Sequence, residues 1–68
     1  MPRIKIFHVK LVNDDWVIKI ENNDVLATTN TKIEAIRHAM ELAKGVEFAR
    51  VVIYKSDGKV DFKRNYPH

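Results

Sequence analysis

The first twenty positions carry the apolar pattern of β-strands, although the alternation is blurred in the first strand, where Ile4 and Ile6 share the parity of His8. β-Branched and aromatic residues dominate positions 4–11, and after a polar turn at 12–15 apolar residues recur at every second position from Trp16 to Ile20. A period of two places alternate side chains on opposite faces of a sheet. The pattern therefore predicts a two-stranded hairpin, and residues 25–28, after a second polar cluster, predict a short third strand.

The hydrophobic period changes between residues 32 and 44. The apolar residues of this segment fall on one half of a helical wheel: Ile33, Ala35, Ile36, Ala39, Met40, Leu42 and Ala43. Thr31 and Glu34 have the spacing of a capping box, and Gly45 is expected to end the helix in the left-handed conformation. We predict a helix from Lys32 to Lys44. Its residues Ile36 and Met40 are expected to meet Trp16 at the centre of the core.

The remaining segment predicts a second hairpin. Residues 48–54 are rich in strand formers, 55–59 form a turn in which Gly58 supplies a positive φ, and 60–62 return antiparallel. The order of elements predicts an α+β fold, with an antiparallel sheet of four or five strands and one helix packed on one face. We expect residues 1–68 to form a single small domain, in which 64–68 are a tail that could be disordered.

Length and charge limit the classes of protein that this sequence can be. A chain of 68 residues without cysteine has one thin core, worth about 3–5 kcal/mol, so self-association is a candidate source of further stability. No apolar stretch approaches the roughly 20 residues that span a bilayer, and we expect a cytoplasmic protein without a membrane partner. The net charge is +3, and its basic excess near the two ends of the chain favours an anionic partner.

Candidate catalytic and metal-binding groups are few. Glu34, His38 and Glu41 share one side of the predicted helix, but one histidine with two carboxylates on a single helix is not a convergent ligand set. Charge pairs on a solvated surface explain this row better. Ser56 is the single serine and lies in a predicted turn, and two isolated glycines cannot form a phosphate-binding loop. We therefore expect no enzymatic activity, no cofactor and no metal.

Several short motifs occur in a characteristic order over nearly the whole chain. They are His8-Val9, Trp16, Ile18-Lys19, Thr31-Lys32, Glu34-Ala35, Ala39, Ala43, Val52-Ile53, Asp57-Gly58 and Arg64-Asn65-Tyr66. In this order the chain resembles the small prokaryotic family called domain of unknown function 2188, found in bacterial and phage proteins. Residues 21–30 lack the Gly and Arg-Ala-Ser usual in the family, and Tyr66 follows Asn65 directly. The resemblance implies a small α+β fold and no established activity.

The sheet face without a helix is the candidate functional surface. If Phe7, Val9 and Leu11 face the core, the opposite face carries a basic set with one aromatic ring: Lys10, Lys19, Arg50, Tyr54 and Lys63. This set predicts nucleic-acid binding, DNA or RNA, by charge and by base stacking on Tyr54. The alternative is a protein-interaction or homodimer contact on the same face, centred on Val17 and Val52. Salt separates the two, because phosphate binding weakens steeply as salt rises.

Overall fold

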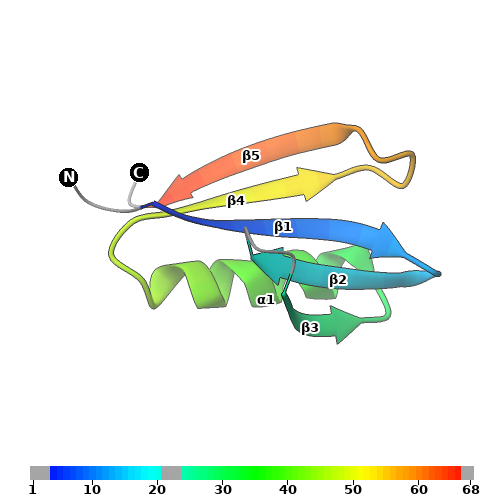
Figure 1. Ribbon diagram of the computed structural model, residues 1–68, viewed down its shortest axis with the longest axis horizontal. Helices are drawn as coiled ribbons and strands as arrows, with labels where there is room; N and C mark the ends of the chain where they lie inside the picture. The colour runs from blue at the N-terminus through cyan, green and yellow to red at the C-terminus, as the bar shows by residue number, and fades with distance from the viewer. Residues whose placement is uncertain (1–3, 21–23, 67–68) are drawn as a thin grey trace.

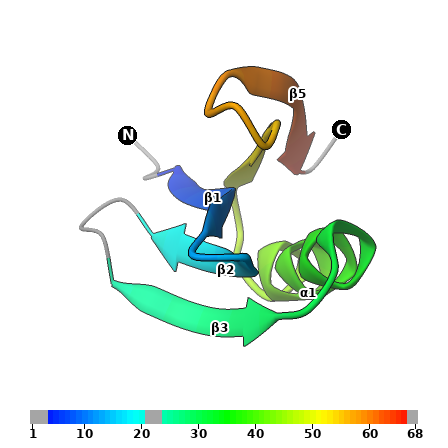
Figure 2. The same ribbon diagram turned by 90° about the vertical axis from the view of Figure 1, so that its right-hand side faces the viewer.

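The structure, a computed structural model, describes residues 4–20 and 24–66. In these ranges the elements are β1 (Lys5–Val12), β2 (Asp15–Ile20), β3 (Val25–Thr29), α1 (Lys32–Lys44), β4 (Ala49–Tyr54) and β5 (Val60–Tyr66). The strands form one sheet, and α1 lies across one of its faces (Figures 1 and 2). The predicted α+β fold, including the third strand, is confirmed, and α1 has the predicted bounds. The predicted turn at 21–24 lies mostly outside the described residues.

The strand order in the sheet is β3-β2-β1-β4-β5. Three neighbouring pairs are antiparallel, as predicted, but β1 and β4 pair in parallel, with Phe7 opposite Val51 and Val9 opposite Ile53. The sheet is therefore mixed. The cause is the connection through α1, which carries the chain back along the sheet so that β4 runs in the direction of β1 (Figure 1). Local patterns predict each strand, whereas the pairing of β4 with β1 depends on where the helix returns the chain.

The turns and helix ends follow the local sequence. Asn13 and Asp14 both have positive φ, of 49° and 69°, which suits a two-residue hairpin loop. Gly58 has the predicted positive φ, at 91°. Gly45 differs from the prediction, because its φ of −81° is right-handed and its N–H donates to the carbonyl of Leu42 at 3.1 Å. The last turn of α1 thus tightens without a left-handed residue.

The start of α1 is held by one half of the predicted capping box, the hydroxyl cap, while the Glu34 carboxylate bonds the Thr31 hydroxyl and not its backbone N–H. The Thr31 hydroxyl oxygen accepts a hydrogen bond from the Glu34 N–H at 3.2 Å and lies 2.9 Å from Oε1 of the same residue. Replacing Thr31 by alanine should lower the free energy of unfolding by about 1 kcal/mol, because one helix amide loses its partner. Urea denaturation measures this loss. Thr31→Ser keeps the hydroxyl and should retain most of the stability, and equal losses in both variants would contradict a capping role.

The core lies between α1 and one face of the sheet, and its centre differs from the prediction. The helix contributes Ala35, Ala39 and Ala43, which are fully buried. The sheet contributes Phe7, Val9, Ile18, Ala49, Val51 and Ile53. Trp16 and Ile36 are only partly buried against this cluster, and Met40 is likewise only partly buried. The predicted centre is therefore wrong. Small alanine side chains let the helix approach the sheet closely, and the larger apolar residues of α1 lie at the side of the helix instead.

Contacts also join α1 to the last strand. The Lys32 Nζ lies 2.7 Å from Asp61 Oδ2 and 5.4 Å from the centre of the Trp16 ring. Residues 64–66, which the sequence assigned to a tail, are the last three residues of β5, paired with β4. Residues 67–68 lie outside the described residues. In the part of the chain that the structure describes, no helix has the length and apolar character needed to cross a membrane.

Candidate nucleic-acid interface

The sheet face opposite α1 carries the predicted basic residues. Lys10, Lys19 and Arg50 each follow a core residue on their strand, so their side chains point away from the helix. The register places Lys19 beside His8, His8 beside Val52, and Val52 beside Lys63. A row across four strands thus has a lysine at each end. We call this helix-free side of the sheet the open face.

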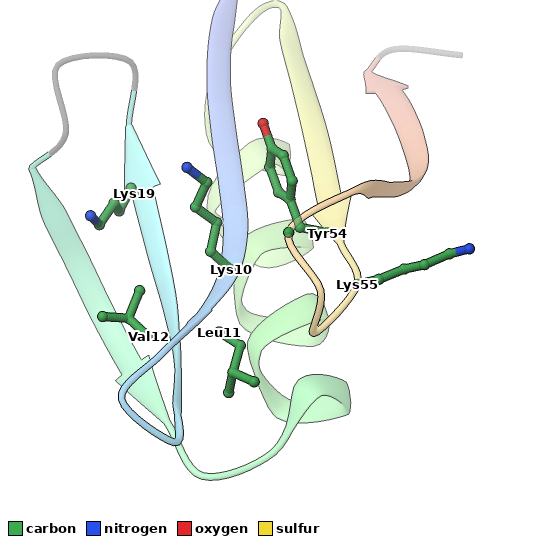
Figure 3. A pocket seen from close by; sticks show the side chains of 7 residues that line it. Lys10, Leu11, Val12, Lys19, Tyr54 and Lys55 are labelled. Carbon is green, nitrogen blue, oxygen red and sulfur yellow. The ribbon is translucent and has the colours of Figure 1, made fainter.

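A hollow of about 250 Å³ lies at one end of the open face. The residues that line it are Lys10, Leu11, Val12, Lys19, Tyr54, Lys55 and Gly58. Three of these carry a positive charge and none is acidic. Figure 3 shows Lys10 next to Tyr54, while the side chains of Lys19 and Lys55 extend outward on opposite sides. The positive charge is thus spread along the surface, an arrangement that suits an extended polyanion better than one compact anion.

Tyr54 is held in place by two neighbours on β1. Its hydroxyl shares a hydrogen bond of 3.0 Å with Nδ1 of His8, and the two rings lie 5.8 Å apart between centroids. The Lys10 ammonium lies over the Tyr54 ring at 5.0 Å from its centroid. A cation over an aromatic face is attracted to it. The ring therefore already has a cationic partner on one face.

The other two predicted site residues lie outside this hollow. The Arg50 Nε donates a hydrogen bond to Oδ1 of Asn65 at 2.9 Å. Arg50 and Asn65 line a separate small hollow near the far end of β4. Lys63 is exposed on β5, opposite Val52. The structure therefore gathers Lys10, Lys19 and Tyr54 at one place, with Arg50 and Lys63 farther along the same face.

Sequence reasoning missed Lys55 as a member of the site. It directly follows Tyr54 and begins the β4–β5 turn, where its N–H donates to the Lys59 carbonyl at 2.7 Å. A lysine in a turn has no face that a strand pattern could assign, so alternation could not place it beside β1. Only its position after Tyr54 in the chain could have indicated that it lies near the basic set.

Val17 and Val52 offer little surface to a partner. They lie on the open face, outside the cluster under α1, yet their exposed fractions are only 7% and 6%. Their strand neighbours on this face include the long side chains of Lys10, Lys19 and Lys63. The alkyl stems of lysines cover apolar surface while their charged ends stay in water. A dimer contact made by these two valines would first have to displace such side chains.

The carboxylate and histidine row on α1 lines a different hollow. Thr29, Glu34, Arg37, His38 and Glu41 surround it. Among the described residues, no group of three or more histidine, cysteine or acidic side chains is arranged to hold a metal ion. Of the charge pairs expected on this helix, Glu41 with Lys44 is formed, at 3.7 Å. A solvated surface accounts for this row.

The fold and the open face define a small α+β protein with a single mixed sheet that is covered on one side. A family model described as an uncharacterized protein conserved in bacteria (DUF2188) matches residues 7–66, and the chain belongs to this family. The predicted resemblance is confirmed. Neither a curated protein nor a solved structure matches the chain.

Proposed function

We propose that this protein is a non-catalytic nucleic-acid-binding module, which holds the phosphate backbone on its open face. The observation that carries the proposal is the hollow on the open face that is lined by Lys10, Lys19 and Lys55 and has no acidic residue in its lining. Lysine contacts to phosphates release counterions from the nucleic acid and supply affinity that does not depend on sequence. The protein would therefore bind single or double strands with little base preference.

The proposal favours backbone contacts over the base stacking that the sequence suggested. Lys10 occupies one face of the Tyr54 ring, and the His8 hydrogen bond holds the phenol in place. A base could stack on Tyr54 only by displacing the Lys10 ammonium. Contacts to phosphate orient a protein on nucleic acid without reading its sequence. Tyr54 then acts by holding Lys10 toward the backbone.

Lys63 and Lys19 extend the proposed contact across the sheet. They end the row Lys19, His8, Val52, Lys63, which crosses three strand-to-strand spacings, a distance of about 14 Å. Successive phosphates of one strand advance by about 3.4 Å along a duplex axis. The row is therefore long enough to follow several phosphates.

The salt dependence of binding tests the proposal. A dye-labelled DNA oligonucleotide should bind at low salt, and the logarithm of its association constant should fall linearly with the logarithm of salt. With three to five phosphate contacts the slope should be about −2 to −4 for single strands. Fluorescence anisotropy measures it. A peptide nucleic acid of the same base sequence has no phosphates and should not bind.

Two results would overturn the proposal. One is the absence of binding to single-stranded DNA, RNA and duplex DNA at low salt. The other is binding whose affinity does not change with salt, since contacts through lysine and phosphate must weaken as salt rises.

A further inference from the structure

A second hollow, of about 170 Å³, lies where β4 begins and β5 ends, at the opposite end of β4 from Tyr54 (Figure 1). We call it the Arg50 hollow. Its lining residues are Ile4, Phe48, Ala49, Arg50, Asn65 and Tyr66. The lining thus combines apolar and aromatic side chains with one cation and one amide, whereas lysines are the charged groups of the first hollow. Such a lining suits a flat, largely apolar group with a polar edge better than it suits a phosphate.

The polar part of the Arg50 hollow belongs to the open face. Arg50 lies between the core residues Ala49 and Val51 on β4, so its side chain points away from α1. Its partner in the register on β5 is Asn65, which therefore shares this face. Ile4, just before β1, is 50% exposed. The Arg50 hollow is thus continuous with the face that carries the lysine-lined hollow.

The Arg50 guanidinium is oriented by the protein and keeps its outer edge for a ligand. Its Nε donates to Oδ1 of Asn65 at 2.9 Å, which fixes the plane of the group relative to β5. Among the described residues, Arg50 makes no other side-chain hydrogen bond and no ion pair. The two terminal nitrogens, Nη1 and Nη2, therefore present a planar fork of donors. Such a fork matches two adjacent acceptors on one edge of a ligand.

We infer that the Arg50 hollow is a nucleobase site, in which an unpaired guanine lies against Phe48 while its N7 and O6 accept hydrogen bonds from Arg50. The inference rests on the proposed function, since the phosphates of the same strand are held by the lysines. Guanine carries two adjacent acceptors on this edge, whereas adenine and cytosine place a donor there and thymine a methyl group. As a purine it also offers a larger ring face to the aromatic lining than cytosine does.

The spacing of the two hollows fits one continuous strand. Tyr54 and Arg50 stand at opposite ends of the open-face side of β4, about 13 Å apart by the rise of a strand. This span equals roughly four nucleotides at the duplex rise of about 3.4 Å, and fewer in an extended single strand. A base within a duplex is paired and stacked, so it must leave the helix before it can enter the hollow. Single strands therefore use both hollows, and duplexes use the lysines alone.

Short thymidine strands with one central variable base test the site by fluorescence anisotropy. The unchanged protein should bind a strand with guanine about fivefold more tightly than one with thymine, the lower end for a bidentate contact because Asn65 is exposed and water competes. A strand with 7-deazaguanine, which lacks N7, should bind nearly as weakly as the thymine strand. The ratio should stay constant as salt rises and both affinities fall, because contacts to a base release no counterions.

Arg50→Lys tests the fork without changing the net charge. A lysine keeps the positive charge but not the planar pair of donors, so the variant should lose the preference for guanine and keep the salt slope. Arg64→Lys is the matched control, because Arg64 precedes Asn65 on β5 but pairs with the core residue Val51 and so belongs to the other face. It should retain the fivefold ratio. Circular dichroism shows that each variant is folded.

Four results would overturn the base site. They are equal affinity for the guanine and thymine strands, an equal preference for a cytosine strand, a preference that survives in Arg50→Lys, and a preference lost as fully in Arg64→Lys. In each case, salt-dependent binding of the thymine strand would leave the phosphate contact on the lysines intact. Absence of binding to every strand at low salt would instead overturn the proposed function, and the base site with it.

Discussion

Replacing Ile53 by alanine is expected to unfold most of the protein at room temperature. Ile53 lies on β4, is fully buried, and belongs to the cluster between the sheet and α1. Removing three buried carbons and leaving a cavity costs about 2–5 kcal/mol. A domain of this size has only about 3–5 kcal/mol to lose. Thermal unfolding followed by circular dichroism should show a melting temperature near or below 25 °C, where no more than half of the chains are folded.

Two isoleucines on α1 serve as matched controls for this substitution. Ile36→Ala should cost clearly less than Ile53→Ala, because Ile36 is only partly buried. Ile33→Ala should have almost no effect, since this side chain is 67% exposed. The expected order of losses is Ile53, Ile36, Ile33. Equal losses at Ile53 and Ile36 would mean that the helix packs by its isoleucine side and that the alanine contact is incorrect.

Reversing two lysines of the open-face hollow should nearly abolish nucleic-acid binding. The double variant Lys19→Glu with Lys55→Glu replaces two of the three lysines in the hollow by acidic residues, which repel phosphate. Lys10 keeps its place over Tyr54. Losing two phosphate contacts lowers the affinity for single strands by roughly 50-fold at low salt and makes the salt slope shallower by about 1.4. Anisotropy titrations at several salt concentrations measure both quantities.

The control for this variant must change the net charge equally. Lys5→Glu with Lys44→Glu changes it equally at two exposed positions. Lys5 lies on β1, on the same side of the sheet as Phe7 and so away from the open face, and Lys44 lies at the end of α1. This control should lose far less affinity, because its charges are not in the hollow. If both variants lose affinity equally, net charge rather than the hollow determines binding. Arg50→Glu should have an intermediate effect, since Arg50 lies on the same face but outside the hollow.

Much of the local structure follows from short-range signals in the sequence. The capping residue Thr31 and the period of 3.6 residues predicted α1 with its exact bounds. Turn residues and alternation predicted all five described strands, although β5 is longer than expected because Arg64, Asn65 and Tyr66 continue the pairing with β4. Alternation also placed Lys10, Lys19 and Arg50 on the open face, whereas Leu11, which it assigned to the core, lies outside the core cluster and lines the hollow. These features depend on neighbours within a few residues, which a sequence pattern reports directly.

Tertiary structure alone decided how these elements meet. The apolar arc of α1 is wide, and only its contact with the sheet selects Ala35, Ala39 and Ala43 as the buried line and leaves Ile33 outside. The parallel pairing of β1 with β4, and the hollow that Lys10 and Lys55 line together, join segments more than forty residues apart. Such choices depend on the total buried surface and the fit of backbones across the core. No local period encodes them, because many registers satisfy the same pattern of apolar and polar residues.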